Sequence, residues 1–205
     1  MSIILIGRRS RHFAGVRYLR RGIDHEGNVA NFVETEQIVY DINKSFDDKP
    51  VFSSFVIVRG SIPLFWTQDP NLLKGKPEIE RKDIKVLIFL VLTSVDTKYL
   101  ATKRHFSELF ERYSYPVYCI NLTKQKYMRE RPLADQYMHV TNEILNRELP
   151  PGMRINYVNF DWKIKKKEGC FPINLWSTVK PFIKRTGFFT CNRIRRYDTN
   201  SQIEV

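Results

Sequence analysis

Apolar and polar positions alternate with a period of two through the N-terminal third of the chain. Side chains of a β-strand point alternately to opposite faces, so this period predicts strands. This alternation marks a candidate strand at residues 31–39 (NFVETEQIV) and a further one, with arginines on one face, that begins at Gly15. Residues 2–6 are a short apolar strand candidate, and residues 52–58 (FSSFVIV) are another candidate. Gly22 and Gly27 predict a turn between two of them, and Pro63 ends the pattern. We therefore expect an antiparallel β unit over residues 1–66.

The second half of the chain follows helical spacing. Apolar residues recur every three or four positions over residues 100–113 and 133–149, and Pro150 ends the second segment. Three further elements are indicated: strands at 116–122 and 155–160, and a helix at 175–183 that Pro181 kinks or ends. This alternation of helices and strands favours an α/β layer with parallel strands.

One apolar run, VLIFLVL at residues 86–92, shows neither a helical nor a strand period. It follows a polar, proline-containing segment at 68–82 that we interpret as a loop. A membrane span needs about 20 apolar residues, so the run is too short to cross a bilayer. A buried strand and an interfacial membrane anchor both fit it.

Composition narrows the class of protein. With 42% hydrophobic residues, the 205-residue chain can bury a core, which excludes a disordered basic tail. Cys119, Cys170 and Cys191 are too few and too distant for a disulfide framework or a four-cysteine zinc site, so a reducing compartment is expected. The basic cluster follows the first apolar run, which is the reverse of a secretory signal.

Positive charge dominates the sequence, because 34 Lys and Arg against 22 Asp and Glu give a net charge of +12. Six arginines gather early in the chain: Arg8, Arg9, Arg11, Arg17, Arg20 and Arg21. Guanidinium groups bind phosphate oxygens in pairs, so a phosphate site and a solvated or core-bracing cluster both remain open. A lysine run at 163–167, interpreted as a loop, is typical of a solvated face or of weak attraction to anionic lipid.

Common nucleotide and metal motifs are missing from the sequence, which has no Gly-x4-Gly-Lys-Ser/Thr, Gly-x-Gly-x-x-Gly or His-Glu-x-x-His. The four histidines show no metal-ligand spacing. A cysteine-dependent phosphatase needs an arginine six positions after its cysteine to bind the transferred phosphoryl group. Those positions hold Gln125, Trp176 and Tyr197 here. We expect no metal and no cofactor.

Two motifs in fixed order are highly specific. Residues 8–40 read RRSRHFAGVRYLRRGIDHEGNVANFVETEQIVY, and residues 54–66 read SFVIVRGSIPLFW. Together they resemble the Sac-domain phosphoinositide phosphatases. Three later segments, HFSELFERYSYPVYCINLTKQ, NRELPPGMRINYVNFDW and VKPFIKRTGFF, resemble the endosomal branch, which removes the 5-phosphate from phosphatidylinositol 3,5-bisphosphate. The resemblance covers most of residues 3–82 and 98–189.

The resemblance implies a mixed α/β fold in which residues 1–205 form the first part of the catalytic half of a Sac domain. It implies supporting or substrate-proximal roles for the residues that match the motifs: Arg8, Arg9, Arg17, Arg20, Arg21, Asn31, Glu34, Thr35 and Glu36. Glu34 and Glu36 have a second interpretation, in which their carboxylates brace the arginines structurally. Neither glutamate can replace a thiolate nucleophile.

The sequence departs from the family pattern in three ways. It contains neither the catalytic Cys-x5-Arg loop, NCxDCLDRTN, nor the subdomain that precedes the arginine-rich motif in relatives. An apolar insert at residues 84–96 interrupts a stretch that is continuous in relatives. We hypothesise a translated intron or a gene-model error there, which sequencing of the transcript tests. We expect a phosphatase fragment that is inactive alone, and the alternative is a noncatalytic lipid-binding or scaffold module.

The expected partners follow from the resemblance: a phosphoinositide headgroup, an anionic membrane surface, and the lipid kinase and helical-repeat scaffold of the endosomal complex. The expected location is intracellular and peripheral to endosomal or vacuolar membranes, without a transmembrane helix. The sequence has no recognition-helix or stacking-sheet motif, so no specific nucleic-acid partner is expected.

Overall fold

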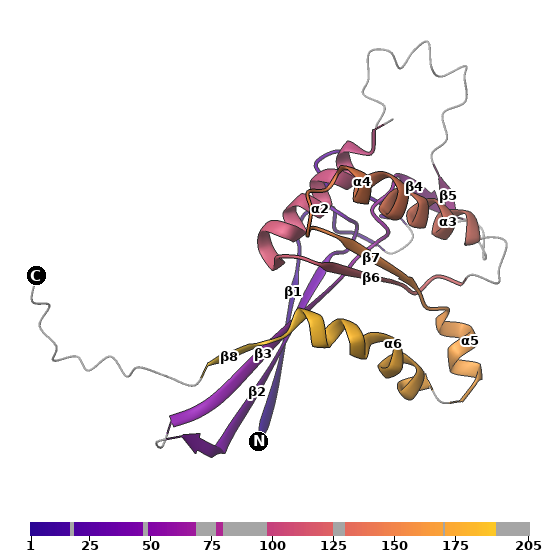
Figure 1. Cartoon of the computed structure of the whole chain (residues 1–205). Helices are drawn as coiled ribbons and strands as arrows, with labels where there is room; N and C mark the ends of the chain where they lie inside the picture. Colours follow the sequence, from indigo (N-terminus) through magenta and orange to yellow (C-terminus); the bar gives the residue numbers. More distant parts are fainter. Residues whose placement is uncertain are drawn as a thin grey trace, which may run out of the picture. The chain divides into compact units, whose positions relative to one another are not determined.

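The computed structural model describes residues 1–16, 19–46, 49–68, 77–79, 98–124, 130–169 and 171–191. These residues fall into two compact units (Figure 1). Within the described residues, one unit contains Met1–Arg8, Glu34–Val58 and residues 187–191, and the other contains Arg9–Val33 and Arg59–Thr186. Each unit therefore combines segments that are far apart in the sequence.

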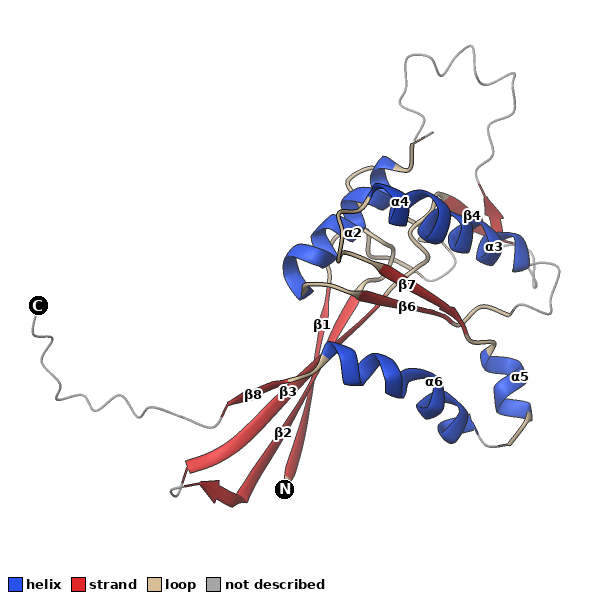
Figure 2. Ribbon diagram, viewed as in Figure 1, coloured by secondary structure: helices blue, strands red, loops and turns tan. Residues whose placement is uncertain are grey.

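The first unit is a four-stranded sheet with the strand order β1-β2-β3-β8 (Figure 2). Its strands are β1 (Ser2–Arg9), β2 (Val33–Phe46), β3 (Lys49–Arg59) and β8 (Phe189–Cys191). β3 and β8 are antiparallel, with Phe52 opposite Cys191. The expected mixed α/β fold with an N-terminal antiparallel sheet is confirmed. β8 was not expected, because three residues are too few to show a period.

The strand predicted from Gly15 is wrong. Residues 11–16 and 19–20 form bends, turns and irregular backbone, and the amides of Leu19 and Arg20 both donate to the carbonyl oxygen of Val16 at 3.0 Å. The alternation covered too few positions to distinguish a strand from a turn.

The second unit contains a two-stranded antiparallel sheet of β4 (Trp66–Gln68) and β5 (Pro77–Ile79). The segment 68–82 is therefore not wholly a loop, contrary to the prediction. Cross-strand pairing with β4 forms β5, and such pairing leaves no period in three residues. The apolar run at 86–92 and the insert at 84–96 lie outside the described residues.

β6 (Val117–Asn121) and β7 (Ile155–Asn159) are parallel, as the α/β pattern predicted. The connection between them includes α3 (Arg131–His139), the π-helical turn η1 (Val140–Leu145) and α4 (Asn146–Glu148). The predicted helix at 133–149 is thus present but contains a π-helical turn. The Asn146 side chain accepts from the amide of Ile155 at 2.9 Å and donates to its carbonyl oxygen at 2.8 Å, which ties the connection to β7.

Helix α2 (Leu100–Tyr113) packs its apolar face into the core of the second unit. Ala101, Phe106 and Leu109 are buried at helical spacing. The main core cluster also includes residues of α3, η1 and β7, and its buried members are Leu64, Trp66, Phe106, Leu109, Leu133, Tyr137, Val140, Leu145 and Ile155. Leu64 and Trp66 therefore connect the SIPLFW segment (residues 61–66) to the α/β layer.

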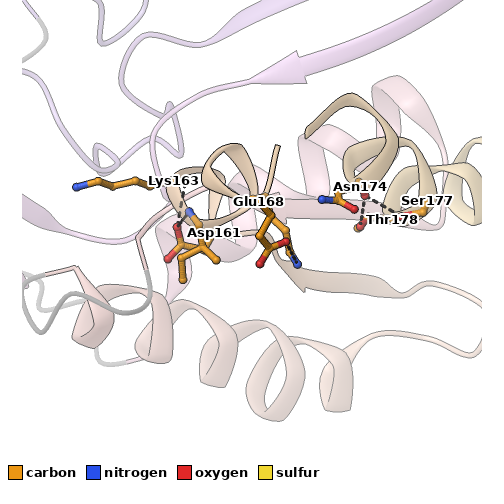
Figure 3. A network of polar contacts seen from close by, with 8 residues as sticks. Asp161, Lys163, Glu168, Asn174, Ser177 and Thr178 are labelled. Carbon is orange, nitrogen blue, oxygen red and sulfur yellow. Dashed lines mark hydrogen bonds and ion pairs between the residues drawn. The ribbon is translucent and has the colours of Figure 1, made fainter. Parts of the chain in front are cut away.

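Helix α5 (Trp162–Lys167) begins at Asp161, whose Oδ1 accepts from the amides of Lys163 and Ile164 at 3.0 and 3.1 Å (Figure 3). The prediction of a loop for the lysine run is wrong, because this N-cap starts a helix. Helix α6 (Phe171–Thr186) extends the predicted helix in both directions and contains Pro181. Among the helices that the structure describes, none has the length and apolarity to span a bilayer.

Hydrogen bonds connect the segment after the arginines (residues 22–30) to the SIPLFW segment. The backbone amide of Ile23 donates to the carbonyl oxygen of Leu64 at 3.1 Å. The backbone amide of Ser61 donates to the carbonyl oxygen of Ala30 at the same distance. The Ala30 amide donates to the carbonyl oxygen of Gly22 at 2.8 Å, which closes the turn. The Gly22 amide donates to the Ser61 hydroxyl at 2.9 Å. The two sequence motifs therefore support each other's backbone.

Gly22 occupies a position in this arrangement that tolerates no side chain. Its φ is +71°, and a Cβ placed there would lie 2.4 Å from the carbonyl oxygen of Leu64. We expect Gly22→Ala to lower the free energy of unfolding by roughly 3 kcal/mol, because left-handed strain adds to a backbone clash. Chemical denaturation of the two proteins measures this loss.

Gly152 provides the matched control. It also has a positive φ, of 92°, but no atom lies within 4 Å of the position of its Cβ. Gly152→Ala should lower the free energy of unfolding by only about 1 kcal/mol. Equal losses in the two variants would contradict the steric role of Gly22.

His105 is a buried histidine whose charge state links stability to pH. Its Nδ1 lies 3.1 Å from the carbonyl oxygen of Gly27, and its ring contacts Phe32 and Phe106 edge-on. Burial lowers its pKa from 6.5 to about 4, against a smaller opposing effect of the hydrogen bond with Gly27. Between these two values the unfolded state binds a proton that the folded state does not. Stability should therefore fall by roughly 2 kcal/mol between pH 7 and pH 5 through this group.

Denaturation curves of the wild type and of His105→Asn, measured at both pH values, isolate this contribution. Asparagine does not titrate, so the stability of the variant should depend less steeply on pH. Parallel pH dependences of the two proteins would show that His105 is not kept neutral by burial.

Candidate functional site

Arg8 lies at the centre of a small charged cluster in the first unit. From β1 its Nη1 donates to Oε1 of Glu34 at 2.9 Å, and its Nη2 donates to Oε2 of Glu36 at 2.6 Å. The glutamates are two positions apart on β2, so the strand period places both on one face. The hydroxyl of Ser54 on β3 donates to Oε1 of Glu36 at 2.5 Å. Three neighbouring strands thus build the cluster.

The charges of this cluster largely compensate one another. The side chains of Glu34 and Glu36 are only 13% and 19% exposed, whereas that of Arg8 is 50% exposed. Hydrogen bonds from Ser54 and Arg8 lower the pKa of Glu36, and hydrogen bonds to Glu36 and Glu34 raise the pKa of Arg8. With both carboxylates ionised, the cluster carries a net charge of −1, which weakens its attraction for a phosphate group.

Arg9 belongs to a separate group in the second unit. Its Nη2 donates to Oδ1 of Asn31 at 2.5 Å, and the same oxygen accepts from the amide of Gly15 at 3.4 Å. Asn31 has a positive φ of 56°, which asparagine tolerates better than most residues. The backbone amide of Asn31 donates to the carbonyl oxygen of Phe13 at 3.4 Å. Asn31 therefore orders the loop that follows Arg9.

Two further residues of the predicted site stack on aromatic rings. The guanidinium carbon of Arg20 lies 5.4 Å from the ring centre of Phe13. The guanidinium carbon of Arg21 lies 5.4 Å from the ring centre of Trp66. Both distances are within the range of cation–π attraction. Arg21 thus contacts a residue of the core cluster directly.

The remaining predicted residues are Thr35 and Arg17. Thr35 lies between the two glutamates on β2, so its side chain points to the opposite face of the strand. Arg17 lies outside the described residues. Among the described residues of the predicted site, hydrogen bonds join Arg8 to Glu34 and Glu36, and Arg9 to Asn31.

Two serines that contribute to these arrangements were not among the predicted residues. Ser54 donates to Glu36, and Ser61 accepts from the amide of Gly22. Both lie in the SFVIVRGSIPLFW motif, which was the signal available in the sequence. Strand register decides which hydroxyl meets which partner, and a single sequence does not specify that register.

Cys119 is unsuited to nucleophilic catalysis. It packs against the core from β6, and burial raises its pKa to about 11, partly offset by a hydrogen bond with Tyr137. The thiolate is the reactive form of cysteine, and this thiol is almost wholly protonated at neutral pH. Cys191 lies in β8, and Cys170 lies outside the described residues.

A surface depression of about 440 Å³ offers a poor site for a polyanion. Its lining residues are Glu26, Leu100, Lys103, Arg104, Ser107, Glu108 and Glu111. Arg104 donates to the carbonyl oxygen of His25 at 2.8 Å, and Lys103 pairs with Glu148 at 2.5 Å, so both cations have partners. Within the described ranges, no group of three or more His, Cys, Asp or Glu side chains is arranged to hold a metal ion.

Comparison with known proteins identifies close relatives. The SacI homology domain family (Syja_N) matches residues 1–167. Phosphoinositide phosphatase SAC4 of Arabidopsis thaliana is 42% identical over 161 residues, which is 78% of this chain and 18% of that protein. Polyphosphoinositide phosphatase of Schizosaccharomyces pombe is 38% identical over 197 residues, 91% of this chain and 22% of that protein. Phosphatidylinositide phosphatase SAC2 of Homo sapiens is 36% identical over 160 residues, 78% of this chain and 12% of that protein.

The chain thus spans between 12% and 22% of the length of these three relatives. The family match includes both groups of motif residues, the cluster around Arg8 and the pair of Arg9 with Asn31. It also includes the SIPLFW segment and the parallel strands β6 and β7. The chain belongs to the SacI homology domain family.

Proposed function

We propose that this chain is the part of a Sac-family phosphoinositide phosphatase that supports the substrate site, and not the part that attacks the phosphate. The observation that carries the proposal is the family match over residues 1–167, which includes every predicted supporting residue. Three relatives are named as phosphatases of phosphoinositides or phosphatidylinositides. The reaction of the whole protein would be hydrolysis of a phosphate ester on an inositol lipid.

The substrate of the whole protein, we infer, is phosphatidylinositol 3,5-bisphosphate, which loses its 5-phosphate. This inference rests on the resemblance of residues 105–125, 146–162 and 179–189 to the endosomal branch of the family. On the same basis, the proposed partners are a lipid kinase and a helical-repeat scaffold. The proposed location is peripheral to endosomal or vacuolar membranes.

The contacts of Arg8 support a positioning role for this part of the protein. Glu34 and Glu36 each accept from a different nitrogen of its guanidinium group, which fixes the side chain between β1 and β2. These two hydrogen bonds hold the end of β1 in position and take no part in a chemical step. The protonated thiol of Cys119 agrees with this division, because it supplies no nucleophile.

A noncatalytic lipid-binding or scaffold module is the second candidate function. It is favoured by the loop after β1, where Val16 and Leu19 are 63% and 68% exposed and Arg11 and Arg20 are exposed as well. Binding to phosphoinositide vesicles that persists at high salt and prefers one headgroup would support a lipid site. Loss of binding on screening would indicate only bulk charge.

The purified 205-residue chain should release no phosphate from vesicles that contain phosphatidylinositol 3,5-bisphosphate. Burial keeps the Cys119 thiol protonated, and no cysteine of the chain is followed by arginine at the sixth position. A colorimetric assay of inorganic phosphate measures the release.

The matched control is the triple variant Cys119→Ser, Cys170→Ser and Cys191→Ser. The wild type and the triple variant should give the same background signal. Phosphate release by the wild type above that background would show that one of these cysteines reacts, and would overturn the noncatalytic role.

A further inference from the structure

Helix α6 presents two different faces. Successive residues of an α-helix are rotated by about 100°, which places four residues in one stripe, the α6 stripe: Ile173, Trp176, Lys180 and Lys184. Phe182 falls on the side opposite Ile173. Its ring stacks on that of Tyr118 in β6, with 4.5 Å between ring centres and 21° between ring planes. The Phe182 side therefore packs on the α/β layer, and the α6 stripe points away from it.

The α6 stripe is apolar near the start of the helix and basic near its end. The side chains of Ile173 and Trp176 are 67% and 52% exposed. Lys180 and Lys184, one and two turns further along, are exposed as well. Neighbouring large apolar side chains at the surface indicate an interaction site, and the adjacent lysines indicate that its partner is negatively charged.

Helix α5 contributes further positive charge beside α6. Lys166 and Lys167 are exposed, and the two helices contact each other. The N-cap at Asp161 holds α5 in its helical form, as Figure 3 shows. The acidic residue at the end of α5, Glu168, pairs with Lys165 at 3.0 Å, so its charge is compensated locally. The α5–α6 pair therefore exposes lysines on both helices.

We propose that α5 and the α6 stripe dock on the surface of an anionic lipid bilayer. Indole and aliphatic side chains partition into the boundary between headgroups and acyl chains, which suits Trp176 and Ile173. Lysine ammonium groups attract anionic headgroups while their methylene stems lie along apolar surface, which suits Lys180 and Lys184. The order along the helix places the apolar contact and the charge contact side by side.

Other partners match only part of this surface. Nucleic acid offers phosphate charge but no apolar layer for Ile173 and Trp176 at the edge of its backbone. A protein partner would have to present an apolar pocket and an acidic patch in the same spacing. An anionic bilayer offers both properties over its whole area, and the net charge of +12 adds attraction at long range.

The docking surface does not rest on the proposed phosphatase function. Its residues lie on α5 and α6, and the supporting residues of the proposed function lie between positions 8 and 36. Vesicles without any phosphoinositide are sufficient to test it. A failure of bilayer docking can therefore be distinguished from a failure of the proposed function, which is support of a phosphatase substrate site.

Vesicle sedimentation of the full 205-residue chain tests the proposal. The probes are vesicles of phosphatidylcholine alone and of phosphatidylcholine mixed with phosphatidylserine. We expect binding to the mixed vesicles and little binding to phosphatidylcholine alone. The double variant Lys180→Glu and Lys184→Glu should bind the mixed vesicles roughly tenfold or more weakly. The double variant Ile173→Ser and Trp176→Ser should also bind more weakly, and its residual binding should be lost at high salt.

Two double variants elsewhere in the second unit provide matched controls. Arg131→Glu with Arg147→Glu changes the net charge equally, at side chains that are 66% and 75% exposed. Leu100→Ser with Leu122→Ser removes two apolar side chains that are each 51% exposed. Both controls should bind the mixed vesicles much more tightly than the matched stripe variants, and the arginine control should lose only the long-range attraction that follows from its lower net charge. Thermal melts confirm that all variants fold.

Tryptophan fluorescence gives a second readout. Emission should shift to shorter wavelength on addition of mixed vesicles, and Trp176→Phe should retain binding but show a smaller shift. Three results would overturn the proposal: no binding of the wild type to mixed vesicles, equal losses in the stripe variants and the controls, or an undiminished shift in Trp176→Phe. Binding of duplex DNA that requires the same lysines, without vesicle binding, would assign the surface to nucleic acid instead.

Discussion

The second unit depends on the hydrogen bonds between two backbone segments that carry the family motifs. Buried backbone N–H and C=O groups need partners, and the segment after the arginines is largely irregular, so it cannot supply all of its own. The SIPLFW segment provides them through the Leu64 carbonyl oxygen and the Ser61 amide and hydroxyl. Gly22 permits the close approach because it has no side chain. Leu64 then continues into the core, so a loop and a core are positioned by the same few contacts.

Positive charge serves two separate purposes in this chain. Near the N-terminus, Arg8 is neutralised by Glu34 and Glu36, and Arg9 is bound to Asn31, so these guanidinium groups hold strands and a loop in place. On α5 and α6, Lys166, Lys167, Lys180 and Lys184 are exposed and lie near apolar side chains. A net charge of +12 therefore does not identify one phosphate-binding patch. Structural arginines and surface lysines contribute to the same total but differ in what they are available to bind.

Sequence patterns predicted the elements whose signal is local and long. Helix α2 and the parallel strands β6 and β7 each carry a period or an apolar run of at least five residues. The three-residue strands depend on partners distant in sequence and left no such signal. The lysine run was interpreted as a loop, whereas the N-cap Asp161 starts helix α5 there. In the candidate site, the motif supplied residue types, while strand register determined that Glu36 also meets Ser54.

Amide hydrogen exchange at Ile23, Ala30 and Ser61 tests most directly whether the two motif segments hold each other in place. Each of these amides donates to a carbonyl oxygen across or within the turn between them. Mutual support predicts that all three exchange slowly, with protection of the same order as the amides of core helix α2, because they open only together with the core. Exchange of these amides at the rate of an open loop, while α2 remains protected, would contradict it.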